Sequence, residues 1–313
     1  MATVRAWHGP LACLVAAMAG WAVVCTSGLF LDGRMLGGAP IWAKPLKFTI
    51  SFGLYGLTLA WMLSLITGPR RRRTGWWAGT TAATVAVLEI IATTVQVVRG
   101  TSSHFNVATP LDAALYAVMG VAVVVLYCAT LLIGVFLALF TELPDRSLAW
   151  ALRLGLLIAV AGLSVGFLMV LPTAQQLAAP DQSVIGSHSV GGDDAGGGLF
   201  FLGWNTRHGD LRPAHFVGMH ALQALPLLAL ALRAVSRARA DRGTRLGEGT
   251  RLRLVFLAAA TWVSLSALVL WQALRGQSII HPDALTWATA GVLALLGAVG
   301  AAGIIRYASQ RRG

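Results

Sequence analysis

The sequence predicts an all-α fold: a polytopic bundle of about eight transmembrane helices with both termini in the cytoplasm. Of the 313 residues, 57% are hydrophobic and only 12% are charged, whereas a soluble domain carries about 25% charged residues. The mean hydropathy is +0.72. In addition, eight apolar stretches approach the roughly 20 residues that a helix needs to cross a bilayer. We therefore expect residues 1–313 to form a single integral membrane domain.

The eight expected helices follow the apolar stretches in chain order. The first resembles a signal peptide because Arg5 precedes it, but no small-x-small cleavage site stands out and we expect it to be retained. The fourth follows Pro110, which pre-sets a first helical turn, with Asp112 or Thr109 as its cap. No discontinuous helix and no convincing internal repeat is evident in the pattern. The stretches are residues 11–30, 48–67, 76–98, 113–140, 149–171, 214–232, 254–274 and 285–305.

Lysine and arginine residues are unevenly divided between the two sides of the predicted membrane. Eight spans place 17 of the 24 basic residues and 4 acidic residues on one side, and 7 basic and 7 acidic residues on the other. The positive-inside rule makes the first side cytoplasmic, and we expect the membrane to be a bacterial cytoplasmic membrane. The basic residues of that side are Arg5, Arg70 to Arg73, Arg146, Arg153, the seven arginines from Arg233 to Arg253, Arg306, Arg311 and Arg312.

This positive charge lies in short loops beside helix ends, although a pI near 11.1 would also suit a nucleic-acid-binding protein. At helix ends the charge sets orientation and contacts anionic lipid headgroups. The expected partner is therefore the lipid bilayer and not a nucleic acid. Residues 233–253 are expected to form a solvated basic linker on the cytoplasmic side.

Residues 172–213 form a long connection that we expect on the extracytoplasmic side. Its many glycines, with Asp193 and Asp194, favour a flexible insertion over residues 180–198, because such a segment is too polar to bury a core. His188 lies within it and is expected to be solvated. Residues 203–213 differ, because they are dense in hydrogen-bonding side chains and lead directly into the sixth helix.

Six of the seven histidines fall on the extracytoplasmic side, so the residues able to bind metal, haem or protons gather there. His215 and His220 are five residues apart on the sixth helix, a separation of about 140° that prevents simple two-point chelation. His104 precedes the fourth helix and offers an imidazole from elsewhere in the chain. We expect a metal or haem site formed by His104 with one of the other two, His220 being favoured because it lies deeper. Its expected polar support is Asp112, Asp210, Arg212 and Gln223.

Glu89 lies ten residues before Arg99 on the third helix, which places it roughly 15 Å inside the membrane. Thr93 and Gln96 follow on the same helical face and form a polar stripe toward the outer surface. A carboxylate at that depth is protonated or finds a cation, and Lys47 is the candidate partner. A structural ion pair and a proton or substrate site both remain open.

Three hypotheses about function follow. The first is a metal- or haem-dependent membrane enzyme, the second is a proton- or anion-linked transporter using the Glu89 stripe, and the third is a structural or partner-binding membrane protein. No phosphate-binding loop, dinucleotide-binding glycine pattern or nucleophile elbow occurs, which argues against an ATPase, a nucleotide-dependent oxidoreductase and a typical serine hydrolase. The candidate catalytic residues are Glu89, Asp112, Asp210, Arg212 and Gln223, the candidate metal ligands are His104, His215 and His220, and the candidate substrate- or ion-binding residues are Lys44, Lys47, Gln96, Arg99 and Asn106.

Overall fold

The computed structural model describes residues 7–179, 182–194, 198–239 and 245–310. The chain divides into two compact units. Unit 1 consists of Met1–Thr141 and Met169–Thr206, and unit 2 of Glu142–Leu168 and Arg207–Gly313. The basic residues Arg5, Arg242, Arg311 and Arg312, part of the glycine-rich loop and the middle of the basic linker lie outside the described residues.

The expected number of spanning helices is confirmed, because eight helical segments of the described residues are long and apolar enough to cross a membrane. Several of them extend beyond the apolar stretches, since a helix can continue past the hydrocarbon into the interfacial region. Helix α2 begins at Ala43, which brings Lys44 and Lys47 into its first turns. Helix α3 begins at Pro69, so that Arg70 to Arg73 are helical.

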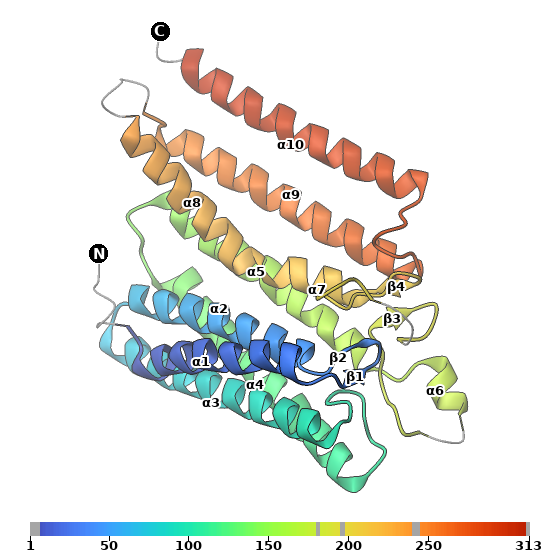
Figure 1. The fold of residues 1–313 in the computed structure, drawn as a ribbon. Coiled ribbons are helices and arrows are strands. Elements are labelled where there is room, and N and C mark those ends of the chain that lie inside the picture. The colour runs from blue at the N-terminus through green and yellow to red at the C-terminus, as the bar shows by residue number, and fades with distance from the viewer. Residues whose placement is uncertain (1–6, 180–181, 195–197, 240–244, 311–313) are drawn as a thin grey trace. The chain divides into compact units, whose positions relative to one another are not determined.

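Unit 1 contains four long helices: α1 (Gly9–Leu31), α2 (Ala43–Leu65), α3 (Pro69–Arg99) and α4 (Pro110–Phe140) (Figure 1). Contacts join α1 to α2, α2 to α3 and α3 to α4. Its loops carry a short helix, α6 (Ala174–Ala178), and the strands β1 (Met35–Leu36), β2 (Ala39–Pro40) and β3 (Ser189–Val190). Strands β1 and β2 pair antiparallel, and the two residues between them, Gly37 and Gly38, have the positive φ values that such a tight turn requires.

Close packing and interhelical hydrogen bonds hold the helices of unit 1 together. A Cβ atom at Gly56 of α2 would lie 3.2 Å from the side chain of Leu14 on α1, so glycine permits the close approach of these two helices. The hydroxyl groups of Tyr55 and Thr130 are 2.6 Å apart and join α2 to α4. Both kinds of contact are typical of helices that associate within a membrane.

Unit 2 contains α5 (Arg146–Met169, to Leu168 in this unit), strand β4 (Gly209–Asp210), α7 (Leu211–Met219), α8 (Ala221–Ala238), α9 (Glu248–Leu274) and α10 (Ala284–Gln310). Helices α5 and α7 meet at two glycines, because a Cβ atom at Gly162 would lie 2.5 Å from the Cα atom of Gly218. The indole nitrogen of Trp262 on α9 donates to the carbonyl oxygen of Val217 on α7 over 2.8 Å. These contacts fix the short helix α7 against its neighbours.

The sixth span differs from the single helix that the sequence predicts. It is divided into α7 and α8 at His220, whose φ of −77° and ψ of −5° lie outside the regular helical values. Pro226 follows within α8 and has no amide hydrogen to donate to Leu222, which weakens helical hydrogen bonding near this point. The hydropathy pattern therefore did not predict the division of this span at His220.

Candidate functional site

The turn that carries His104 is covered by residues 182–190 of the long loop, which we call the loop cap. The amide of Ile185 donates to the carbonyl oxygen of Phe105 over 2.8 Å, and the amide of Val107 donates to the carbonyl oxygen of Ser183 over 2.9 Å. Phe105 has a φ of 61°, a strained value for a residue with a bulky side chain. This backbone pairing differs from the flexible insertion expected from glycine content, because the loop cap finds partners on the turn below it.

Gln176 on α6 holds the middle of the loop cap with both ends of its side-chain amide. Its nitrogen donates to the carbonyl oxygen of Gly186 over 2.9 Å, and its oxygen accepts from the amide of Gly186 over 3.0 Å. Gly186 has a φ of 99°, and a Cβ atom there would lie 2.6 Å from the ring of Phe105. Glycine is therefore required at this position both by the backbone angle and by the close ring.

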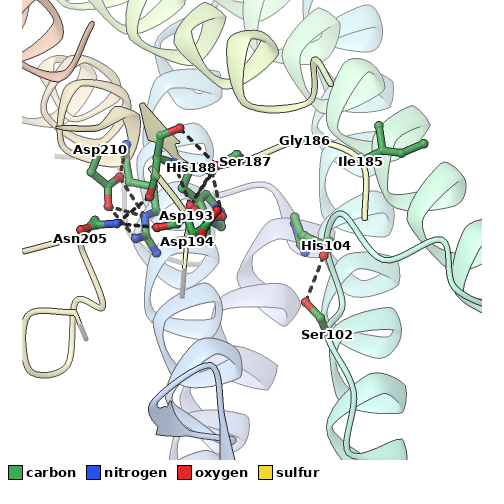
Figure 2. Close-up of polar contacts among 12 residues, drawn as sticks. Ser102, His104, Ile185, Gly186, Ser187, His188, Asp193, Asp194, Asn205 and Asp210 are labelled. Carbon is green, nitrogen blue, oxygen red and sulfur yellow. Dashed lines mark hydrogen bonds and ion pairs between the residues drawn. The ribbon is translucent and has the colours of Figure 1, made fainter. Parts of the chain in front are cut away.

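His188 and Asp194 fasten the other end of the loop cap. Asp194 accepts hydrogen bonds from the ring and the amide of His188, at 3.1 Å and 3.0 Å, and from the amide of Ser189 at 2.8 Å. Burial opposes the charged form of Asp194, but these donors outweigh it and hold its pKa well below the usual value. In Figure 2 His188 and Asp194 lie in one cluster of polar contacts, and His104 with Ser102 forms another. The sequence does not predict this pair, because a lone histidine in a polar, glycine-rich loop is usually solvated.

His104 lies among aromatic rings beneath the loop cap. The ring of Phe48 is 5.4 Å from the ring of His104, and the rings of Phe105 and Tyr116 are 6.3 Å and 6.5 Å away. Burial lowers the pKa of His104 well below its ordinary value, and the nearby charges of Lys44 and His188 lower it further. His104 is therefore neutral at physiological pH. Its Nδ1 atom lies 3.1 Å from the hydroxyl oxygen of Ser103.

Arg99 and Asp112 form an ion pair between α3 and α4. The side chain of Gln96 joins both, since its amide nitrogen donates to Asp112 over 2.8 Å and its oxygen accepts from Arg99 over 2.6 Å. Of the two cap candidates in the sequence, Thr109 is the one that caps α4, and its hydroxyl also donates to Asp112 over 2.6 Å. Asn106 stabilises the turn between α3 and α4, because its side chain donates a hydrogen bond to the Thr101 hydroxyl and accepts one from the Ala108 amide. These predicted site residues therefore come together as an interhelical network.

Glu89 is buried in unit 1 below this network, with 1% of its surface exposed. Neither of its carboxylate oxygens has a hydrogen-bond partner among the described residues, and the buried hydroxyl of Thr93, one turn away, has none either. The Lys47 ammonium donates instead to the carbonyl oxygen of Leu202 over 2.8 Å. The polar stripe thus faces neighbouring helices, and its deepest member is an unsatisfied carboxyl group.

In unit 2, His215 and His220 each direct the Nδ1 atom at an oxygen. His215 Nδ1 is 2.9 Å from the carbonyl oxygen of Gly162, and His220 Nδ1 is 3.3 Å from the side-chain oxygen of Gln223. An oxygen of this kind only accepts, so Nδ1 carries the hydrogen and Nε2 keeps its lone pair. Asp210 accepts from the Arg212 amide over 2.8 Å and pairs with its guanidinium over 2.6 Å, an arrangement that caps α7.

The predicted metal ligands are divided between the units, because His104 belongs to unit 1 whereas His215 and His220 belong to unit 2. In the part of the chain that the structure describes, no group of three or more His, Cys, Asp or Glu side chains is arranged to hold a metal ion. No family model, no curated protein and no solved structure matches the chain.

Proposed function

We propose that this integral membrane protein is a proton-linked transporter in which Glu89 is the proton-binding group. The observation that carries the proposal is the burial of both Glu89 oxygens without a hydrogen-bond partner among the described residues. An isolated charge at the centre of a membrane costs at least about 2.5 kcal/mol even on permissive scales, so the carboxyl group is neutral at rest. A neutral acid that is costly to ionise is suited to binding and releasing a proton.

The side chains above Glu89 supply a polar route away from it. Thr93 and Gln96 continue the same face of α3, and Gln96 contacts the network of Arg99 and Asp112. A proton is favoured over an anion as the transported charge, because Arg99 is already engaged with a carboxylate and a guanidinium so paired is a weaker anion site.

We further propose that both termini are cytoplasmic and that the loop cap faces outward in a bacterial cytoplasmic membrane. The support is the uneven charge distribution, with 17 of the 24 basic residues on the side of the termini. In this orientation the stripe from Glu89 to Gln96 leads toward the outer surface, where the loop cap pairs with the turn that follows α3. The proton would then be exchanged with the extracytoplasmic side.

Proton flux into proteoliposomes tests the proposal. Vesicles with an internal pH-sensitive dye are given a membrane potential by potassium and valinomycin, and internal acidification is compared for the wild type, Glu89→Gln and Glu142→Gln. Glu142 is exposed and lies outside the helices, so its variant is the matched control. We expect Glu89→Gln to abolish protein-dependent acidification and Glu142→Gln to retain it. Equal fluxes in all three proteins would contradict a role of Glu89 and would leave a structural or partner-binding protein as the better account.

A second candidate is a metal- or haem-dependent membrane enzyme, which the ring orientations of His215 and His220 favour. Histidines that bind metals usually donate one ring N–H to an oxygen and coordinate through the other nitrogen, and both rings meet the first condition. Metal analysis and an absorption spectrum of the purified protein are the test, with His215→Ala and His220→Ala compared to the exposed control His281→Ala. A stoichiometric metal or haem lost only in the first two variants would support this candidate, and a spectrum without either would remove it.

A further inference from the structure

Residues 199–202 form an apolar turn at the tip of a narrow hairpin in unit 1, which we call the apolar tip: Leu199, Phe200, Phe201 and Leu202. Gly198 and Asn205 form an antiparallel bridge at its base. The amide of Leu199 donates to the carbonyl oxygen of Trp204 over 2.9 Å, and the amide of Gly203 donates to the carbonyl oxygen of Leu199 over 2.7 Å. The hairpin is thus a tight, internally bonded structure and presents its tip in a fixed form.

The two phenylalanines of the apolar tip are turned outward. Phe200 is 97% exposed and Phe201 is 41% exposed. Phe201 also has a φ of 65°, a strained backbone for an aromatic residue that persists only where surrounding structure imposes it. The hairpin therefore holds a strained backbone and leaves one of the largest apolar side chains without cover. A surface built in this way is typical of a binding element rather than of a solvated loop.

The hairpin is attached to the end of a membrane span. The ammonium group of Lys47, in the first turns of α2, donates to the carbonyl oxygen of Leu202 over 2.8 Å. Lysine side chains at span ends place their charge at the membrane surface. Asn205 adds a second attachment, because its side chain donates to the Ser189 hydroxyl over 2.8 Å and to the Asp193 carbonyl oxygen over 3.0 Å. The apolar tip is consequently held beside the N-terminal end of α2.

From this attachment we propose that the apolar tip inserts into the bilayer leaflet that adjoins the N-terminal end of α2, with Phe200 as the inserted side chain. Apolar side chains such as Phe and Leu are buried about 5–10 Å into the boundary between headgroups and acyl chains in proteins that bind the membrane surface. Insertion surrounds Phe200 with acyl chains and removes its apolar ring from water, which lowers the free energy. The inference is independent of the transporter proposal and of which side of the membrane is cytoplasmic, because it depends only on the position of α2.

Spin labelling tests this insertion in phosphatidylcholine vesicles. A nitroxide is attached to Phe200→Cys or to Gln182→Cys, an exposed position elsewhere in the long loop, after Cys13, Cys25 and Cys128 have been replaced by alanine. Oxygen concentrates in the acyl region and a nickel chelate in water, so the ratio of their relaxation effects reports depth. We expect the label at position 200 to be more accessible to oxygen than to nickel, and the label at position 182 to show the reverse. Size-exclusion chromatography confirms that both labelled proteins remain monodisperse.

Two outcomes would overturn the insertion. Equal and high nickel accessibility at positions 200 and 182 would place the apolar tip in water. Protection of position 200 from both reagents would show that protein covers it, either a partner or a second copy of the chain. A second variant tests whether the hydrogen bond from Lys47 positions the apolar tip. Lys47→Met removes the bond to Leu202, and we expect it to reduce the oxygen accessibility of the label at position 200. No change in that variant would show that Lys47 does not set the depth of the tip.

Discussion

The amide of Ile185 donates to the carbonyl oxygen of Phe105 across 2.8 Å, and this bond joins two segments that are far apart in the sequence. Phe105 directly follows His104, so the bond places the loop cap over the histidine. The ring of His188 lies 4.7 Å from the ring of Phe105 and extends the cover. Access to His104 therefore depends on how firmly the loop cap is fastened.

Replacing Asp194 by asparagine should loosen the loop cap. The carboxylate accepts from His188 and Ser189, and an amide oxygen is a weaker acceptor for the same donors. We expect faster hydrogen exchange of the amides between residues 183 and 190, measured by mass spectrometry. Asp193→Asn is the matched control, because the hydrogen bond at this residue is accepted by its backbone carbonyl oxygen, which the substitution keeps. Unchanged exchange in Asp194→Asn, or equal increases in the two variants, would contradict the fastening role.

Acidification should destabilise unit 1 through His104. The folded-state pKa of this ring is lowered well below 6.5 by burial, so the unfolded chain takes up a proton first as the pH falls below about 6.5, and the free energy of unfolding decreases. The contribution of the buried, neutral His104 ring to the free energy of unfolding is fully present above that pH. We expect the melting temperature to fall less between pH 7 and pH 5 in His104→Gln than in the wild type. If the melting temperatures of the two proteins fell equally between pH 7 and pH 5, burial would not protect His104 from protonation.

The number and the order of the spanning helices were predictable, because length and hydropathy decide them. Helix ends were less predictable: the apolar pattern stops at the hydrocarbon, whereas α2 and α3 continue into the interface. The division at His220 was also missed, since no hydropathy change marks it. A proline six residues later was the one local signal available.

Of the candidate site, the stripe from Glu89 to Gln96 was predictable from helical spacing, and all three of its side chains are buried. The partner of Lys47 was not predictable, because the carbonyl of Leu202 comes from a loop 155 residues further along the chain. The pair of His188 and Asp194 is equally hidden in sequence, since it depends on the local path of a glycine-rich loop. Residue spacing alone does not predict contacts that depend on the path of a loop.

Substitution of Gly162 by alanine should destabilise unit 2. A Cβ atom there would lie 2.5 Å from the Cα atom of Gly218, and backbone cannot yield as a flexible side chain can. We expect a loss of about 1–3 kcal/mol, the usual cost of overpacking, measured by unfolding in mixed detergent micelles. Gly291→Ala on α10 is the matched control, because nothing lies within 4 Å of its Cβ position. Equal stabilities of the two variants would rule out a close crossing of α5 and α7.

Site-directed labelling should reveal the proposed orientation. In a background without the native cysteines, Gln182→Cys is expected to react with an impermeant maleimide added to intact cells, and Ser309→Cys is expected to react only after the membrane is opened. Both side chains are exposed, so burial does not limit either reaction. The reverse pattern would invert the orientation and place the loop cap in the cytoplasm.

Infrared difference spectroscopy measures the protonation of Glu89 directly. We expect a carboxylic-acid C=O band in wild-type protein reconstituted at neutral pH, retained in Glu142→Gln and absent from Glu89→Gln. We also expect the band to shift in heavy water, because a transporter must exchange the Glu89 proton with the solvent. A missing band would mean that Glu89 is ionised despite its burial, and a band that heavy water leaves unshifted would mean that the carboxyl group is neutral but sealed from any proton path.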